Sequence, residues 1–270
     1  MRNLRSAHNR DYLDLLALRA HRTVREGYYQ MEPEPSPHEE GRDRRSLVEA
    51  IRECRWRNPL IAEIKPYSPS KGRLRTRIDY SRLAASMERG GAVALSILTE
   101  PKVFRGSLRG LMEARLSTSL PILMKDVVVD PIQVEAASRL GADAILLIHA
   151  LFRRGLARVG LRDMISLAHS KGLEVILEAH ARDEIAEIKA VGPDLVGVNN
   201  RDLTTLKVDL ETTKRLLEGY RGPPTVGESG VEDPSHVRLL MGWGVDAVLV
   251  GSSIMAARDV AGKVRELVEA

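Results

Sequence analysis

The chain contains a single cysteine, Cys54, among its 270 residues. One cysteine can form neither an internal disulfide nor a cysteine-based metal site, so we expect a protein of the reducing cytoplasm. Aromatic residues make up only 4%, which leaves few platforms for stacking single-stranded nucleic acid. No apolar run approaches the roughly 18 residues of a membrane span, and the arginine-rich N-terminus lacks the apolar stretch of a secretory signal. We therefore expect neither a nucleic-acid nor a membrane partner.

Lysine is also scarce, because most basic residues are arginines and no lysine precedes Lys65. A lysine, unlike an arginine, shifts its pKa readily and can donate a proton, so lysines at strand ends are candidates for chemistry. The net charge is +4 with both signs interspersed, as on a solvated surface. The length suits one α/β barrel, a class that reaches about 250 residues as a single domain.

The short apolar run 60–64 predicts a buried strand, and it carries Glu63 with Lys65 just beyond it. Side chains two apart in a strand share a face, so these two project together. A solvated ion pair on an edge strand is the alternative interpretation. The loop that follows contains Ser68, two prolines and a second serine.

Apolar runs and amphipathic stretches then alternate to the end of the chain. The expected strands are Leu60–Ile64, Val93–Leu98, Pro121–Met124, Ala144–Ile148, Glu174–Leu177, Leu195–Val198, Pro224–Val226 and Ala247–Val250. The expected helices are Tyr80–Arg89, Leu108–Arg115, Pro131–Leu140, Leu161–Lys171, Asp183–Val191, Leu210–Leu217, Ser235–Met241 and Asp259–Val268. Eight such units predict an α/β fold, a (β/α)8 TIM barrel over 59–270. An open doubly wound sheet is the competitor, but the first strand lacks its glycine-rich turn.

Residues 1–58 are predicted to form an N-terminal helical extension ahead of the barrel. One amphipathic helix is predicted over 1–31, proline-rich sequence follows it, and a second helix is predicted from about 45 to 55. Trp56, Trp243 and Cys54 are interpreted as packing residues.

Polar residues gather where the predicted strands end, which is where barrel enzymes place their active sites. Lys125 ends the third strand and is a candidate acid, base or Schiff-base residue with a pKa lowered by desolvation. A structural pair with Asp126 is the alternative. Glu178 ends the fifth strand, as a candidate base or stabiliser of positive charge, or as a salt-bridge partner. His149 and His180 lack metal-ligand spacing and are interpreted as hydrogen-bonded supporting groups.

Glycine–serine turns follow the last two strands, Ser229-Gly230 and Gly251-Ser252-Ser253. Glycine lets the backbone approach a ligand closely, and N–H groups at a helix start bind anions. Because barrel enzymes bind phosphate after strands seven and eight, these turns predict a phosphate site. Arg201 and Lys65 are candidates to add positive charge, and two ordinary capped turns are the alternative.

Together these segments resemble the indole-3-glycerol phosphate synthase family. The motifs that carry the resemblance are Ala62-Glu63-Ile64-Lys65, Ser68-Pro69-Ser70-Lys71-Gly72, Ser96-Ile97-Leu98-Thr99-Glu100, Pro121-Ile122-Leu123-Met124-Lys125-Asp126, Gly197-Val198-Asn199-Asn200-Arg201-Asp202-Leu203, Glu228-Ser229-Gly230 and Gly251-Ser252-Ser253.

The resemblance implies ring closure, decarboxylation and dehydration of 1-(2-carboxyphenylamino)-1-deoxyribulose 5-phosphate in tryptophan biosynthesis, without metal or cofactor. It implies Lys125 as general acid, Glu178 beside the cationic intermediate, and Glu63 with Lys65 in the dehydration. The implied substrate contacts are Ser68, Phe104, Asn199, Arg201, Ser229, Gly230, Gly251 and Ser252. The resemblance also implies that the extension 1–58 covers the barrel mouth. We expect a monomer.

One position departs from the family pattern. The family commonly has an aromatic residue after its Lys-Asp pair, lining the anthranilate pocket, where this chain has Val127. Phe104 and the N-terminal helices are expected to supply apolar wall instead. Two other functions were weighed. A sugar-phosphate isomerase such as phosphoribosylanthranilate isomerase would need a Cys or Asp pair at the strand ends. A non-catalytic phosphosugar-binding barrel would not need four acid–base candidates.

Overall fold

A computed structural model describes residues 11–30 and 45–270 of the chain. Parallel strands close into a barrel in the order β1-β10-β9-β8-β7-β6-β5-β4. The barrel strands are β1 (Leu60–Ile64), β4 (Ala94–Leu98), β5 (Ile122–Lys125), β6 (Ala144–Ile148), β7 (Glu174–Ala179), β8 (Leu195–Asn199), β9 (Thr225–Glu228) and β10 (Ala247–Val250). The predicted TIM barrel is therefore confirmed.

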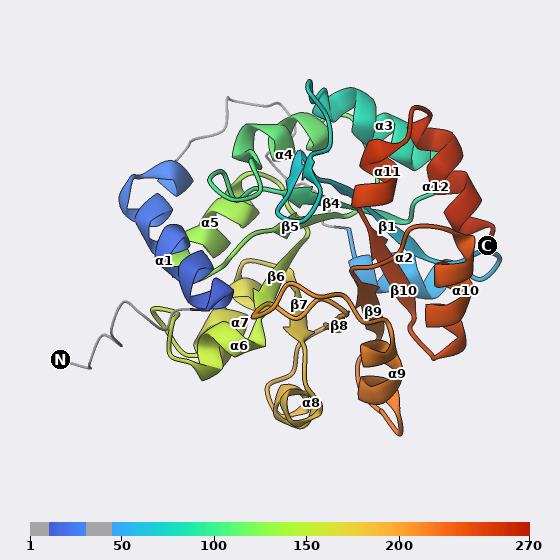
Figure 1. Cartoon of the computed structure of the whole chain (residues 1–270). Helices are drawn as coiled ribbons and strands as arrows, with labels where there is room; N and C mark the ends of the chain where they lie inside the picture. Colours follow the sequence, from blue (N-terminus) through green and yellow to red (C-terminus); the bar gives the residue numbers. More distant parts are fainter. Residues whose placement is uncertain (1–10, 31–44) are drawn as a thin grey trace.

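Helices surround the ring of strands (Figure 1). They are α3 (Tyr80–Gly90), α4 (Leu108–Arg115), α5 (Pro131–Arg139), α7 (Leu161–Ser170), α8 (Arg182–Lys189), α9 (Glu211–Leu217), α10 (Pro234–Gly242) and α12 (Val260–Val268). The last of these, α12, packs beside α3 and so completes the outer layer. Among the described residues, no helix is both long enough and apolar enough to cross a membrane.

Several short elements were not predicted. A hairpin of β2 (Tyr67–Ser68) and β3 (Gly72–Arg73) occupies the loop after β1, and short helices α6 (His149–Arg153) and α11 (Ser252–Ala256) directly follow β6 and β10. Their few residues carry too little apolar periodicity to be recognised. The strands β5, β7, β8 and β9 also run one or two residues further than expected. Ladder pairing continues through their polar ends, as in the Asn199–Glu228 pair.

Side chains alternate between two apolar layers. Leu60, Ala62 and Ile64 of β1 belong to the layer between strands and helices, whereas Ile61 belongs to the barrel interior. The same alternation in β5 places Met124 outside and Leu123 inside. Glu63 and Lys125 continue the inward-facing series, because residues two apart in a strand share a face.

The N-terminal segment supplies helices to both ends of the barrel. Helix α1 (Tyr12–Arg25) ends before Gly27, whose φ of 79° is left-handed, so the helix predicted over 1–31 is shorter than expected. Its residues 1–10 and 31 lie outside the described part. A short turn, η1 (Tyr28–Gln30), follows. The Tyr29 hydroxyl donates to both carboxylate oxygens of Asp126 at 3.0 Å, which joins the segment to the end of β5.

Helix α2 (Leu47–Glu53) lies at the opposite, amino-terminal end. Leu47 and Ile51 are buried and pack into the barrel interior with Ile61. Glu174, the first residue of β7, caps the helix by accepting the Leu47 N–H at 2.7 Å and the Val48 N–H at 3.1 Å.

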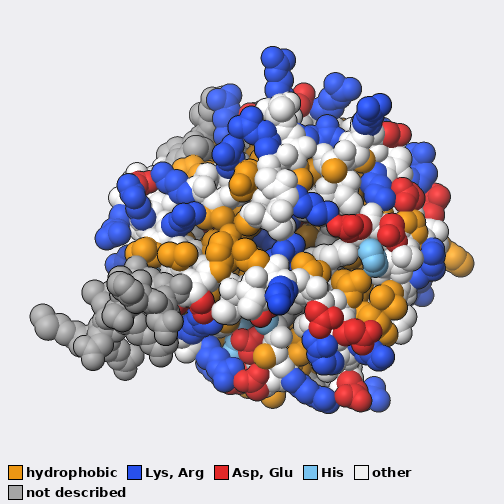
Figure 2. Space-filling model, in the orientation of Figure 1, with side chains coloured by type: hydrophobic (Ala, Val, Ile, Leu, Met, Phe, Trp, Pro, Cys, Tyr) orange, Lys and Arg blue, Asp and Glu red, His pale blue; other side chains and the backbone are white. Residues whose placement is uncertain are grey.

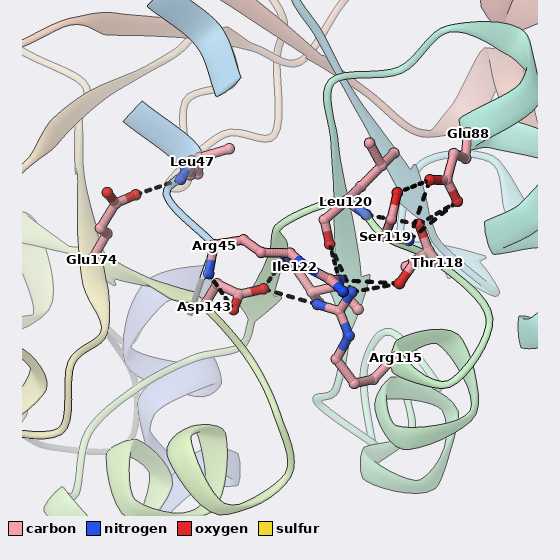
Figure 3. Close-up of polar contacts among 10 residues, drawn as sticks. All are labelled: Arg45, Leu47, Glu88, Arg115, Thr118, Ser119, Leu120, Ile122, Asp143 and Glu174. Atoms are coloured by element: carbon pink, nitrogen blue, oxygen red, sulfur yellow. Dashed lines mark hydrogen bonds and ion pairs between the residues drawn. The ribbon is translucent and has the colours of Figure 1, made fainter. Parts of the chain in front are cut away.

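Hydrogen bonds and the Arg115–Asp143 ion pair connect elements at that amino-terminal end (Figure 3). The Arg115 guanidinium donates to Asp143 Oδ2 at 2.9 Å, and the same oxygen accepts the Ile122 N–H at 2.8 Å. Arg45 and Arg115 both donate to the carbonyls of Thr118 and Leu120. Trp56, by contrast, is 97% exposed, so its assignment as a packing residue was wrong.

Candidate active site

A cavity opens at the carboxyl ends of the strands. Its polar lining comes from Glu63, Lys65, Ser68, Ser70, Lys125, Asp126, Glu178, Asn199, Arg201 and Ser229. Its apolar lining comes from Tyr12, Leu16, Pro69, Leu98, Phe104, Val127, Leu146, Ile148, Leu203 and Leu206. Hydrophobic side chains and basic side chains likewise lie next to one another around the middle of the face drawn in Figure 2. The cavity therefore combines charged and apolar walls.

Lys125 lies at the centre of a charged cluster. Its ammonium group pairs with Glu228 Oε2 and lies 3.7 Å from Glu63 Oε1. Lys65 pairs with the other oxygen of Glu63 at 2.5 Å. These carboxylates reach the cluster from β1 and β9, strands that lie on either side of β10 in the barrel. Glu63, predicted as half of a rim pair, is shared by two lysines.

Burial and charge set the protonation states of this cluster. Burial opposes ionisation of Glu63, but Lys65 and Lys125 outweigh it and hold the pKa of Glu63 below its usual value. Burial raises the pKa of Glu228 to about 7 despite the neighbouring Lys125. Burial would lower the pKa of Lys125, but Glu228, Glu63 and Glu178 reverse that effect and raise it. The predicted lowering of the Lys125 pKa was therefore wrong, because sequence did not reveal the carboxylates around it.

Asp126 does not pair with Lys125, because neighbouring strand residues face opposite sides. Its carboxylate instead accepts hydrogen bonds from Thr99 and Tyr29. The structural pair weighed for Lys125 is absent from the ion pairs of the described residues. Asp126 therefore helps to attach the N-terminal segment to the barrel through Tyr29.

Glu178 approaches the cluster from β7. Burial raises the pKa of its carboxyl group, which Lys125 and a hydrogen bond from Asn199 oppose. Its Oε1 atom is buried and accepts no well-aligned hydrogen bond among the described residues. The same holds for Oε1 of Glu228 and for both carboxylate oxygens of Glu63, which face the ammonium groups of Lys65 and Lys125. Buried polar atoms are ordinarily hydrogen-bonded. Such a group of exceptions in one cavity is typical of a functional site.

Two glycines make room for these carboxylates. A Cβ on Gly197 would lie 2.5 Å from Glu228 Oε1, and a Cβ on Gly251 would overlap Oε2 of Glu63. Because both glutamates are buried, neither carboxylate could move away into solvent. The strands β8 and β10 therefore need glycine beside the cluster.

The predicted phosphate turns have unusual backbone geometry. Ser229 and Gly230 both adopt left-handed φ values, 65° and 89°, and Ser252 opens α11 directly after Gly251. Ser229 and Arg201 line the cavity, whereas Gly230, Gly251 and Ser252 are not among its lining residues. Arg201 donates to the Leu206 carbonyl at 2.8 Å, which fixes its guanidinium at the cavity wall.

Phe104 and Ser68 also reach the cavity. Glu100 accepts the backbone N–H groups of Lys102, Val103 and Phe104 at 2.6–3.0 Å, and so fixes the loop that carries Phe104. The Ser68 hydroxyl lies 3.1 Å from that of Ser70.

Sequence reasoning assigned no role to Glu228, although its place at a strand end, just before the Ser229 turn, was the available signal. Glu228 pairs with Lys125 but is not among the residues that line the cavity. Tyr12 and Leu16 come from α1, and no local pattern shows where that helix docks. Among the described residues, no group of three or more His, Cys, Asp or Glu side chains could hold a metal ion.

A closed barrel with acid–base side chains collected at the carboxyl ends of its strands has the arrangement of a TIM-barrel enzyme. The family model for indole-3-glycerol phosphate synthase matches residues 22–267. The chain therefore belongs to the indole-3-glycerol phosphate synthase family.

Individual relatives agree with the family model. Indole-3-glycerol phosphate synthase of Methanopyrus kandleri is 44% identical over 216 residues, covering 78% of this chain and 83% of the relative. The Methanocaldococcus jannaschii protein of that name is 42% identical over 226 residues, covering 82% of each chain. Thiamine phosphate pyrophosphorylase from Pyrococcus furiosus has a TM-score of 0.59 at 18% identity, covering 82% of this chain and 96% of that one. The last likeness shows the fold alone.

Proposed function

We propose that the chain is a carboxy-lyase that converts 1-(2-carboxyphenylamino)-1-deoxyribulose 5-phosphate into indole-3-glycerol phosphate, carbon dioxide and water. The observation that carries the proposal is the Lys125 ammonium group, buried among Glu63, Glu178 and Glu228 in a cavity with one apolar wall. The family match supports the same reaction. The proposed chemistry uses side chains only, without a metal or cofactor.

Ring closure is assigned to Lys125. The aromatic carbon that bears the carboxylate attacks the ketone carbon, and the ketone oxygen must gain a proton as this bond forms. Lys125 is held in its protonated form by the carboxylates around it, so it carries that proton at neutral pH. A proton donor placed at a reacting oxygen contributes about 10²- to 10⁴-fold to rate.

The ring formed by this attack carries positive charge. Glu178, buried on β7, is assigned to stabilise that charge as a carboxylate in a water-poor site. Loss of carbon dioxide then returns an electron pair to the ring and restores its aromaticity. Dehydration follows, in which the hydroxyl leaves with a proton and the neighbouring carbon loses one. The paired Glu63 and Lys65 supply one acid and one base for this step.

The remaining assignments are supported in part by the lining of the cavity and in part by membership of the family. Asn199 is assigned to a sugar hydroxyl, Ser68 and Phe104 to the substrate's flank, and Val127 leaves space beside the anthranilate ring. The phosphate is assigned to Arg201 and to the two turns, formed by Ser229 with Gly230 and by Gly251 with Ser252. We further propose that 1–58 is the covering extension and 59–270 the catalytic barrel of a cytoplasmic monomer. Tyr12 and Leu16 in the cavity wall support the covering role.

Turnover of the purified chain tests this function. Mixing it with the substrate should produce indole fluorescence and an equal amount of carbon dioxide. Substrate that binds and protects the protein against heat without either product would instead indicate a phosphosugar-binding barrel. Absence of both turnover and binding would overturn the proposal.

A further inference from the structure

His180 follows Glu178 by two residues at the end of β7, so the two side chains share a face. Nε2 of His180 lies 3.3 Å from Oε1 of Glu178. The two side chains are 16% and 3% exposed. Both atoms are buried, and neither has a well-aligned hydrogen-bond partner among the described residues. His180 does not line the cavity, so any effect it has on chemistry passes through Glu178.

A capping interaction fixes the backbone beneath the imidazole. Glu184 Oε2 accepts the N–H groups of His180 at 2.7 Å and Ala181 at 3.2 Å. The other oxygen of Glu184 lies 3.6 Å from Nδ1 of His149, whose Nε2 lies 3.1 Å from Glu187. This second, buried histidine restrains Glu184, and Glu184 in turn restrains His180. The backbone that carries the imidazole is therefore fixed, and among the ion pairs of the described residues the ring is paired with Oε1 of Glu178.

We propose that His180 is a positioning residue: its neutral imidazole donates the Nε2 proton to Oε1 of Glu178, which orients that carboxylate and stabilises its ionised form. The role of Glu178 is that of the proposed function, on which the catalytic part of the inference rests. No proton is transferred between the two side chains in this interaction. A hydrogen bond to the charged form of an acid favours that form.

The surroundings of His180 keep its imidazole neutral. Burial lowers the pKa of His180, although the carboxylates of Glu184, Glu228 and Asp202 act in the opposite direction. A neutral imidazole has one N–H donor, and the partner of each nitrogen selects the tautomer. The groups that face the Glu178–His180 pair are Lys125 from β5, Glu63 from β1, Asn199 from β8, Glu228 from β9, Glu184 from α8 and Asp202 after β8.

Removing the His180 N–H donor should change the pKa of Glu178 in a predictable direction. Burial already raises the pKa of Glu178. Without the Nε2 proton its ionised form loses a hydrogen bond, so the pKa rises further. The acid limb of kcat, where Glu178 becomes protonated, then moves to higher pH.

The decisive variants are His180→Leu, which keeps bulk without a donor, and His180→Gln, which returns an N–H near the position of Nε2. We expect His180→Leu to move the acid limb up by about one pH unit, and so to lower kcat about tenfold at pH values below both limbs, with KM within twofold. His180→Gln should recover most of both losses. His169→Leu, at an exposed histidine paired with Asp194, is the matched control and should leave the profile unchanged.

A second measurement does not depend on turnover. Carbon-13 NMR of the Glu178 side-chain carboxyl, titrated without substrate, should give a higher pKa in His180→Leu than in the wild type. If His180→Leu does not fold, His180→Asn replaces it, because the shorter asparagine amide does not reach the Glu178 carboxylate. The pKa of Glu178 should then rise more in His180→Asn than in His180→Gln. An unchanged acid limb together with an unchanged Glu178 pKa would overturn the inference while leaving the proposed function intact. Wild-type protein without turnover would instead count against the proposed function, and the NMR titration would still decide the role of His180.

Discussion

The two ends of the barrel use buried charge in opposite ways. At the amino-terminal end, Asp143 accepts hydrogen bonds from Arg115 and from the Arg45 and Ile122 backbones, and Glu174 caps α2. At the carboxyl end, the carboxylates of Glu63, Glu178 and Glu228 keep buried oxygens without hydrogen bonds among the described residues.

This difference separates stability from chemistry. A buried carboxylate whose oxygens accept hydrogen bonds from the protein is already satisfied, so it has no need of a hydrogen bond from a substrate. A carboxylate has a shifted pKa when burial opposes its ionisation and a lysine favours it. If its oxygens also lack well-aligned hydrogen bonds, it can bind a substrate or exchange a proton. Barrels divide these roles between their ends in general, and here the division is visible atom by atom.

The largest effect is expected from Lys125→Ala. It removes the proposed proton donor and leaves Glu63 and Glu228 without their shared cation, so kcat should fall about 10³-fold or more. The fold should persist, because the side chain adds nothing to the apolar layers. Steady-state kinetics with circular dichroism measure both, and Lys214→Ala, at an exposed lysine, is the control. Near-normal kcat in Lys125→Ala would show that another group donates the proton.

Asp143→Asn should produce the reverse pattern. The Asp143 carboxylate is fully buried and paired with Arg115, whose side chain is 8% exposed. Removing one partner of a buried pair costs about 3 kcal/mol of unfolding free energy, whereas kcat should stay within twofold. Urea unfolding and kinetics provide the two readouts. Asp183→Asn breaks an exposed pair with Arg153 and should leave the free energy of unfolding nearly unchanged. If Asp143→Asn lowered kcat as strongly as Lys125→Ala does, the amino-terminal end would also serve catalysis. That result would contradict the division of stability and chemistry between the two ends.

The smallest effect concerns Asp126, which lies at the carboxyl end but serves attachment. Burial, with a contribution from Glu100, raises its pKa to about 7, against hydrogen bonds from Thr99 and Tyr29. The unfolded carboxyl group has a pKa near 3.8, so between these values the folded protein binds more protons than the unfolded chain. The contribution of Asp126 to stability therefore falls as pH rises from about 4 to 7.

Unfolding free energies measured at several pH values test this sign. Relative to Asp126→Asn, the wild type should lose unfolding free energy steadily across that interval. The exposed Asp163 offers a control, since Asp163→Asn should track the wild type. A wild-type curve that rises relative to Asp126→Asn over the same interval would show that the Asp126 pKa is lowered on folding.

An interaction of the site could be predicted from sequence only where its residues lie close together in the chain. The period of two in β1 placed Glu63 and Lys65 on one face, because strand geometry is local. The same rule excludes a Lys125–Asp126 pair, since adjacent residues face opposite sides. The Lys125–Glu228 pair, by contrast, joins residues 103 positions apart, and only closure of the barrel brings them together.

The docking of α1 was beyond sequence for the same reason. The His21 ring nitrogen of α1 lies 2.7 Å from the Leu156 carbonyl, and Tyr29, in the η1 turn that follows, donates to Asp126. These partners lie in loops whose positions depend on the whole barrel. Trp56 shows the converse error, because a large aromatic side chain is interpreted as core by default, yet nothing in its immediate sequence shows that it is exposed.

The double use of the N-terminal segment has a consequence for synthesis of the chain. Tyr29 and Leu47 leave the ribosome well before Asp126 and Glu174, the residues they bind. The segment therefore cannot dock until more than half of the barrel has been made, and β1 must wait longer still for β10. During that interval the apolar faces of α1 and α2 have no partner. Slow translation before residue 174 would prolong that exposure, whereas slow translation after it would give both helices time to find their places.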